Sequence, residues 1–159
     1  VFTAMVAMFN YALGDMIGEW TGLNGVIASA TDGKYDTLSF QFIFGLIGAP
    51  LAWLVGIDHG NLMVAGQLFG ERMVLNEFVA FFTMNQLEAD GTLTDERTRI
   101  ILTYALCGFA NIVSIGIQIG GIGALAPEKR QELAKLGWRA LLGGSLACFI
   151  PACIAAVLI

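Results

Sequence analysis

The sequence has few charged residues, one histidine and three cysteines, and each shortage excludes a class of protein. Charged residues make up 13% of the 159 residues, whereas an ordinary soluble domain carries about 25%. The cysteines all lie in apolar stretches, with neither a disulfide framework nor metal-ligand spacing, so no metal site is expected. The net charge of −5 is spread over polar connections, which argues against nucleic acid as a partner.

Long uncharged stretches are what the sequence has instead. Residues 38–57, 100–126 and 140–159 are runs of 20, 27 and 20 residues without a formal charge. A run of about 18 or more such residues predicts a membrane span. We therefore predict an all-α integral membrane protein, with transmembrane helices over residues 38–57 and 140–159.

Residues 61–87 predict a re-entrant helical hairpin. Two uncharged arms, 61–70 and 78–87, flank a more polar centre that contains Asn76 and Glu77. A ten-residue helical arm is roughly 15 Å long, half of a ~30 Å hydrocarbon core, so the tip would lie near the membrane midplane. A bare charge there costs about 2.5–3.5 kcal/mol, and we hypothesise that Glu77 is kept because it binds a ligand. The alternative is one full-length helix over 61–87, with Glu77 facing neighbouring helices.

Residues 95–125 predict a discontinuous transmembrane helix. Polar side chains recur there at spacings of three and four and would share one face of a continuous helix; they are Tyr104, Cys107, Asn111, Ser114 and Gln118. Several glycines weaken the same stretch. A polar, glycine-weakened span beside a half-length hairpin indicates a transporter's binding site. Hydrogen bonding between helices, without any transport role, is the alternative.

The two ends and the basic segment complete the predicted organisation. Residues 1–36 read as the end of a membrane helix and a loop, and the chain ends at Ile159 inside an apolar run. We expect a longer polypeptide whose N-terminal half is absent here. Residues 127–139 hold four of the eight basic residues and are predicted to form a cytoplasmic loop, which places the acidic loop 88–96 outside.

Two motifs resemble the C-terminal half of the concentrative nucleoside transporter family. Residues 76–80, Asn-Glu-Phe-Val-Ala, resemble the family's NEFVA segment, with Phe81 in place of its usual Tyr. Residues 105–111, Ala-Leu-Cys-Gly-Phe-Ala-Asn, resemble its ALCGFAN segment. The match runs from about residue 38 to the C-terminus and more loosely back to Val1.

The resemblance implies a trimer in which re-entrant hairpins flank partly unwound helices. It also implies a substrate site in which Glu77, Asn111 and Ser114 hold the ribose hydroxyls and Phe109 lies beside the sugar and base. The family's first hairpin and most of its sodium ligands have no counterpart in these 159 residues.

The expected function is cation-coupled, secondary-active uptake of nucleosides across the cytoplasmic membrane. Sodium is the first candidate for the coupling ion and the proton the second, with no resident cofactor. The expected partners are a nucleoside, the lipid bilayer, the missing N-terminal half and two further copies in a homotrimer. The alternative is a non-transporting helical membrane subunit whose polar stripe serves helix packing. An intramembrane enzyme is not expected, because no nucleophile–base pair accompanies Glu77.

Overall fold

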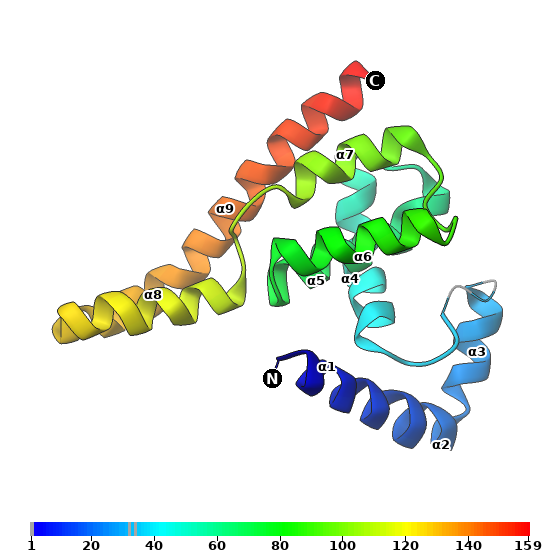
Figure 1. Cartoon of the computed structure of the whole chain (residues 1–159), viewed down its shortest axis with the longest axis horizontal. Helices are drawn as coiled ribbons and strands as arrows, with labels where there is room; N and C mark the ends of the chain where they lie inside the picture. The colour runs from blue at the N-terminus through cyan, green and yellow to red at the C-terminus, as the bar shows by residue number, and fades with distance from the viewer. Residues whose placement is uncertain (1, 32, 34) are drawn as a thin grey trace.

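The computed structural model describes residues 2–31, 33 and 35–159, and every regular element within them is a helix (Figure 1). The chain begins with α1 (Phe2–Tyr11), a π-helical segment (Ala12–Gly18), α2 (Glu19–Thr21) and α3 (Leu23–Ala30). The longer helices that follow are α4 (Phe40–Val55), α5 (Leu62–Val74), α6 (Glu77–Ala89), α7 (Glu96–Leu106), α8 (Ile112–Leu125) and α9 (Arg130–Leu158).

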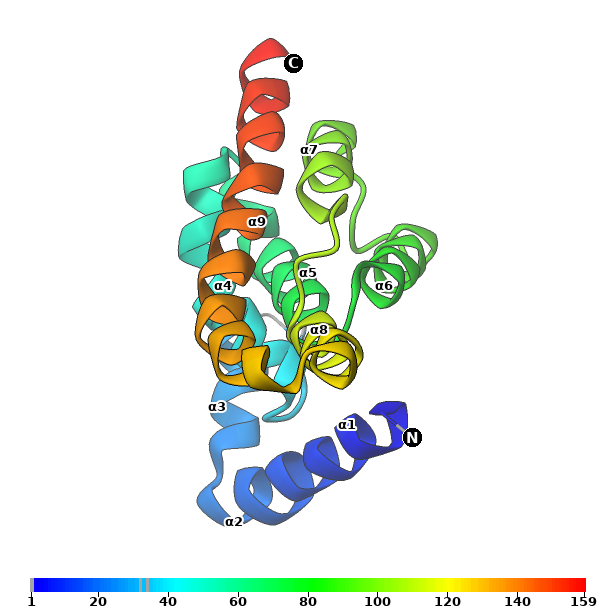
Figure 2. The same cartoon turned by 90° about the vertical axis from the view of Figure 1, so that its left-hand side faces the viewer.

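The N-terminal helices lie at one end of the molecule, next to the start of α4 (Figures 1 and 2). Asn10 joins them to α4, because its amide donates to Gln41 Oε1 and accepts from the Phe40 amide, each at 2.9 Å. The loop predicted within residues 1–36 is shorter than expected, since α3 occupies Leu23–Ala30. Val1, Asp32 and Lys34, which belong to that predicted segment, lie outside the described residues.

α4 and α5 pack closely through glycine. A Cβ atom on Gly48 would lie 2.5 Å from the carbonyl oxygen of Gly66, and one on Gly66 would collide with the backbone of Gly45 and Ala49. Close contact between backbones is typical of helix association in lipid. Lipid tails are as apolar as the side chains, so the hydrophobic effect does not drive two helices together there. The apolar core continues from this pair across α6, α7 and the C-terminal half of α9.

The hairpin segment is broken at Leu75 and Asn76. α5 ends at Val74, Asn76 is extended (φ −168°, ψ 171°), and α6 begins at Glu77. The alternative of one uninterrupted helix over residues 61–87 is therefore wrong. That the hairpin is re-entrant in the membrane stays a prediction.

A second break separates α7 from α8. α7 ends at Leu106, and the chain is non-helical until Asn111 (φ −140°, ψ 161°) caps α8. The polar stripe is thus divided: Tyr104 belongs to α7, whereas Ser114 and Gln118 belong to α8.

The predicted loop 127–139 is a helix for most of its length. A 3₁₀ turn covers Pro127–Lys129, and α9 then runs without interruption from Arg130. Pro127 suits a helix start, and the Gln, Glu, Leu, Ala and Lys residues that follow favour helix. The basic residues therefore occupy the first turns of the last helix, and their cytoplasmic position stays a prediction.

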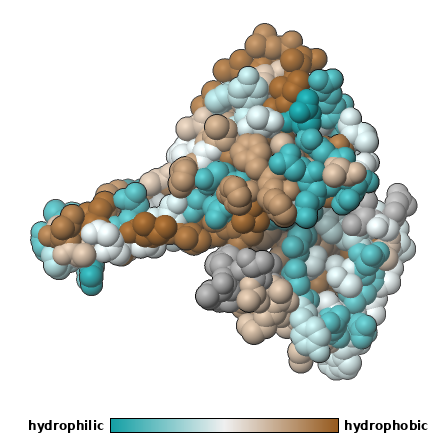
Figure 3. Space-filling view, in the orientation of Figure 1, coloured by the Kyte–Doolittle hydropathy of each residue, from teal (hydrophilic) through white to brown (hydrophobic). Residues whose placement is uncertain are grey.

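One stretch of the described chain, Pro127–Leu158, is a helix long and apolar enough to cross a membrane; α4 and α8 are apolar but shorter. α8 and the first half of α9 lie side by side as an arm that projects from the remaining helices (Figures 1 and 2). The arm is mostly apolar along its length and hydrophilic at its tip (Figure 3).

Candidate ligand-binding site at two helix breaks

Each helix break ends in an asparagine that caps the next helix. Asn76 Oδ1 accepts a hydrogen bond from the Val79 amide at 2.9 Å, and Asn111 Oδ1 accepts one from the Ser114 amide at 2.7 Å. Side-chain caps satisfy amides that the first helical turn leaves without partners. Both helices therefore begin at a fixed residue, and in each case the cap leaves the asparagine Nδ2 group free to donate elsewhere.

Glu77 is the first residue of α6. Its side chain is half-buried, and its Oε2 atom is buried without a hydrogen-bond partner among the described residues. The positive end of the helix dipole favours a carboxylate at this position. Glu77 thus has an oxygen that is shielded from water and available to a hydrogen-bond donor.

Arg72 is a buried cation near the two helix breaks, and the sequence motifs do not reveal its contacts. It is fully buried in the last turn of α5, and its Nη1 donates to the Ala105 carbonyl of α7 at 2.7 Å. Its guanidinium lies 5.5 Å from the Phe149 ring centroid and interacts electrostatically with Glu77. Arg72 therefore connects the hairpin to the last turn of α7, immediately before the second break.

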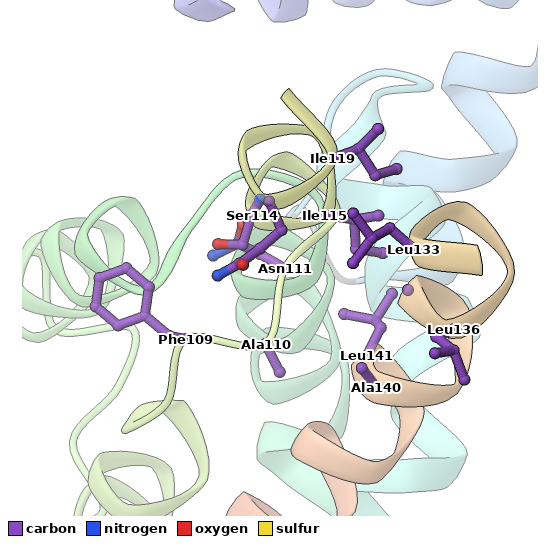
Figure 4. A pocket seen from close by; sticks show the side chains of 12 residues that line it. Phe109, Ala110, Asn111, Ser114, Ile115, Ile119, Leu133, Leu136, Ala140 and Leu141 are labelled. Atoms are coloured by element: carbon purple, nitrogen blue, oxygen red, sulfur yellow. The ribbon is translucent and has the colours of Figure 1, made fainter. Parts of the chain in front are cut away.

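A cavity of about 310 Å³ lies between α8 and α9. Asn111 and Ser114 line it on the α8 side, and Leu133 and Leu136 line it across from them on α9 (Figure 4). Phe109, which also lines the cavity, is 79% exposed and points away from the leucines. The volume suits a small ligand, and the combination of an apolar wall with a few polar groups is typical of small-molecule sites.

The structure thus brings three of the four predicted site residues to one cavity. Asn111, Ser114 and Phe109 line it, whereas Glu77 does not. Among the residues described, no cluster of three or more His, Cys, Asp or Glu side chains could hold a metal ion. The chemistry available at the breaks is hydrogen bonding by an amide, a hydroxyl and a carboxylate.

The sequence profile of one protein family covers almost the entire chain. Residues 1–156 match the family described as "Na+ dependent nucleoside transporter C-terminus". The chain belongs to this nucleoside transporter family. Members are integral proteins of the plasma membrane, so the predicted family, fold class and location are confirmed, and the chain is not an enzyme.

Curated relatives of this nucleoside transporter chain come from bacteria and animals. It is 39% identical to an uncharacterized transporter of Haemophilus influenzae over 99% of its own length and 36% of the relative's. It is 42% identical to the putative nucleoside permease NupX of Escherichia coli, over 76% of its own length and 29% of the relative's. It is 34% identical to the mouse sodium/nucleoside cotransporter 1, over 99% of its own length and 24% of the relative's. The chain therefore spans about a third or less of these relatives.

Solved structures with the same fold include those of CNTnw. The chain matches CNTnw in an inward-facing substrate-bound state with a TM-score of 0.81 and 35% identity. It matches an intermediate state of a CNTnw variant with a TM-score of 0.82 and the same identity. Each match covers 98% of this chain and 35% of CNTnw. The roles of Glu77, Asn111, Ser114 and Phe109 are not tested by these likenesses and stay predictions.

Proposed function

We propose that this chain supplies the ribose-binding half of a nucleoside site in a cation-coupled, secondary-active importer. The observation that carries the proposal is the pair of capped helix breaks, because each presents polar atoms to a ligand. Glu77 offers a buried, unpartnered oxygen at one break, and Asn111 and Ser114 line a cavity at the other.

The ribose of a nucleoside suits these groups chemically. Its vicinal hydroxyls can donate to a carboxylate, and bonds to charged acceptors are the stronger kind. The Asn111 amide can donate to the same sugar while its oxygen caps α8, and the Ser114 hydroxyl can donate or accept. Phe109 is exposed and free to lie beside the sugar and base.

The remaining parts of the proposal concern the whole protein. Sodium is the first candidate for the coupling ion, in keeping with the family's description, and the proton is the second. The other half of the protein would supply the nucleobase contacts and most sodium ligands. We further propose a homotrimer in the membrane, as the family resemblance implies.

Replacing Glu77 in the full-length protein tests the proposed site. We expect Glu77→Gln to abolish uridine uptake into proteoliposomes, because the carboxamide removes the charge that strengthens the bonds to the ribose hydroxyls. Glu96→Gln is the matched control, since Glu96 is exposed in a surface ion pair with Arg99, and it should leave uptake unchanged.

Both variants must reach the membrane in wild-type amounts for the comparison to count. Wild-type uptake by Glu77→Gln would overturn the assignment of Glu77. Absence of uptake by the unmodified full-length protein, for each nucleoside tested, would favour the non-transporting subunit. Replacing sodium by choline in the same vesicles identifies the coupling ion.

A further inference from the structure

A second buried carboxyl group lies in the hairpin, away from the proposed ribose site. Glu71 is 4% exposed and belongs to the last turn of α5. Gln67 Nε2 donates to Glu71 Oε1 at 2.9 Å. Oε2 is buried and has no partner among the described residues. The side chain therefore has one bonded oxygen and one buried oxygen that is unused.

The surroundings of Glu71 supply no opposite charge. Among the residues that the structure describes, no basic side chain is within ion-pair distance of it. Its neighbour Arg72 is directed to Ala105 and Phe149. The position also lies at the negative end of the α5 dipole, in contrast to Glu77 at the positive end of α6.

The other elements packed against α5 do not supply a compensating charge. Tyr35, from the segment before α4, interacts electrostatically with Glu71 and donates its hydroxyl to Gln67 Oε1 at 2.9 Å. α4 and α8 contain no charged residue. The remaining titratable groups on these elements are His59 in the turn before α5, Glu77 and Glu88 on α6, and Glu96, Arg97, Arg99 and Tyr104 on α7. Of the arginines, Arg97 donates to the Gly56 and Ala156 carbonyls and Arg99 faces Glu96.

The ligand that fits a single free oxygen is a proton. A sodium or other metal ion needs several converging oxygens, whereas Oε1 already accepts from Gln67 and the Gln67 carbonyl already accepts from Tyr35. A proton needs one oxygen and removes the buried charge, which is the costly form of the group.

Protons can reach this region through a second cavity. It has a volume of about 380 Å³ and is lined by Tyr35 and Gln67, together with Gly91 and Thr92 of the acidic loop. Gln67 thus faces the cavity and also bonds to Glu71. By the predicted topology, the loop 88–96 and therefore this cavity face the outside.

We propose that Glu71 Oε2 is a proton-binding site whose occupancy is required for uptake. A proton from water in the cavity bonds to Oε2 and converts the carboxylate into a neutral carboxyl group, which can be buried at lower cost. The inference rests on the proposed function, since uptake is its readout, but its site is distinct from the ribose site.

The test is the pH profile of uptake by the full-length protein. Wild-type uptake should fall by about tenfold per pH unit once Glu71 loses its proton, because the protonated fraction falls by that factor. Glu71→Gln mimics the neutral group and should give uptake within about twofold of the wild-type acid value at every pH. Glu96→Gln, the matched surface control, should retain the wild-type profile.

Several results would overturn the proposal. One is a wild-type pH profile in Glu71→Gln. Another is a loss of sodium dependence in that variant with the pH profile intact, which would make Glu71 a sodium ligand. If Glu71→Gln fails to reach the membrane, Glu71→Asp takes its place, because it keeps a carboxyl group and should keep a pH-dependent profile at reduced uptake.

Infrared spectroscopy gives a readout that does not depend on transport. The carbonyl band of a protonated carboxyl group should be present in the purified wild-type protein at acid pH, vanish on alkalinisation and shift in frequency in Glu71→Asp. If the wild-type protein takes up no nucleoside, the proposed function fails while this band still decides whether Glu71 holds a proton. Absence of a titrating band would contradict the inference.

Discussion

At the scale of single residues, Asn111 combines a structural role with a proposed binding role in one side chain. Its Oδ1 caps α8 by accepting from the Ser114 amide at 2.7 Å, and its Nδ2 remains available to a ligand. The two roles use different atoms, so they can be separated by substitution.

We predict that Asn111→Asp folds normally but binds nucleoside poorly. Aspartate is as good an N-cap as asparagine, yet it has no N–H donor and adds a negative charge to the proposed ribose site. Affinity measured by calorimetry on the full-length protein should fall at least about tenfold, a loss of about 1.4 kcal/mol. The thermal midpoint should stay near that of the wild type.

Asn111→Ala serves as the complementary variant, because it removes both the cap and the donor. It should lose about 1 kcal/mol of stability as well as affinity. Wild-type affinity in Asn111→Asp would show that the amide does not contact the ligand.

The sequence revealed the residues that carry a motif but not those that act through packing. Glu77 and Asn111 were identified as candidates because a charge or an amide inside an apolar run is conspicuous. Arg72 has a partner 33 positions away, and that partner is the backbone carbonyl of Ala105. A carbonyl has no side-chain signature, so the partner could not be inferred without coordinates.

At the scale of the secondary-structure elements, the breaks were more predictable than the continuous helices. Asn76 and Asn111 are strong N-cap residues within apolar runs, and both breaks occur there. The segment 127–139, expected to be a loop, is helical because charge alone does not end a helix. Pro127 lies at its start, and Gly137 is the one other residue of the segment that weakens a helix, which α9 tolerates. Charge patterning predicts which side of a membrane a segment lies on, and it says little about its conformation.

The contact between α4 and α5 gives a prediction about element packing. Gly66→Ala should destabilise the full-length protein by about 1–3 kcal/mol, because the added methyl group meets backbone atoms of Gly45 and Ala49, which cannot rotate away. Thermal unfolding in detergent measures the effect.

Gly143→Ala is the matched control for this prediction. A Cβ atom at Gly143 in α9 would have nothing within 4 Å, and alanine favours helix over glycine by up to about 1 kcal/mol. Equal effects of the two substitutions would contradict a specific close approach between α4 and α5.

At the scale of the whole molecule, the chain exposes much apolar surface. Trp20, Leu125 and Val157 are among the exposed large side chains. Since large contiguous apolar patches mark sites covered by a partner or by a membrane, we expect lipid and the rest of the transporter to cover them. The family assignment agrees, because this chain matches only about a third of the length of CNTnw.

The predicted topology is testable by the labelling of single cysteines in the full-length protein. In a background with Cys107, Cys148 and Cys153 replaced, Asp90→Cys should react with a membrane-impermeant maleimide in intact cells, because the acidic loop is predicted to lie outside. Gln131→Cys, at the start of α9, should react only after the cells are opened. The reverse pattern would invert the topology.

The length of α9 has a mechanical consequence for the protein in its bilayer. Its 29 residues extend about 44 Å, well beyond a hydrocarbon layer of ~30 Å. The part of α9 that extends beyond the hydrocarbon layer carries Lys135 and Arg139, whose long side chains are suited to the headgroup layer. We expect these cations to resist sliding of the helix toward the opposite leaflet, so that α9 would fix the depth in the bilayer of α8, which packs against it.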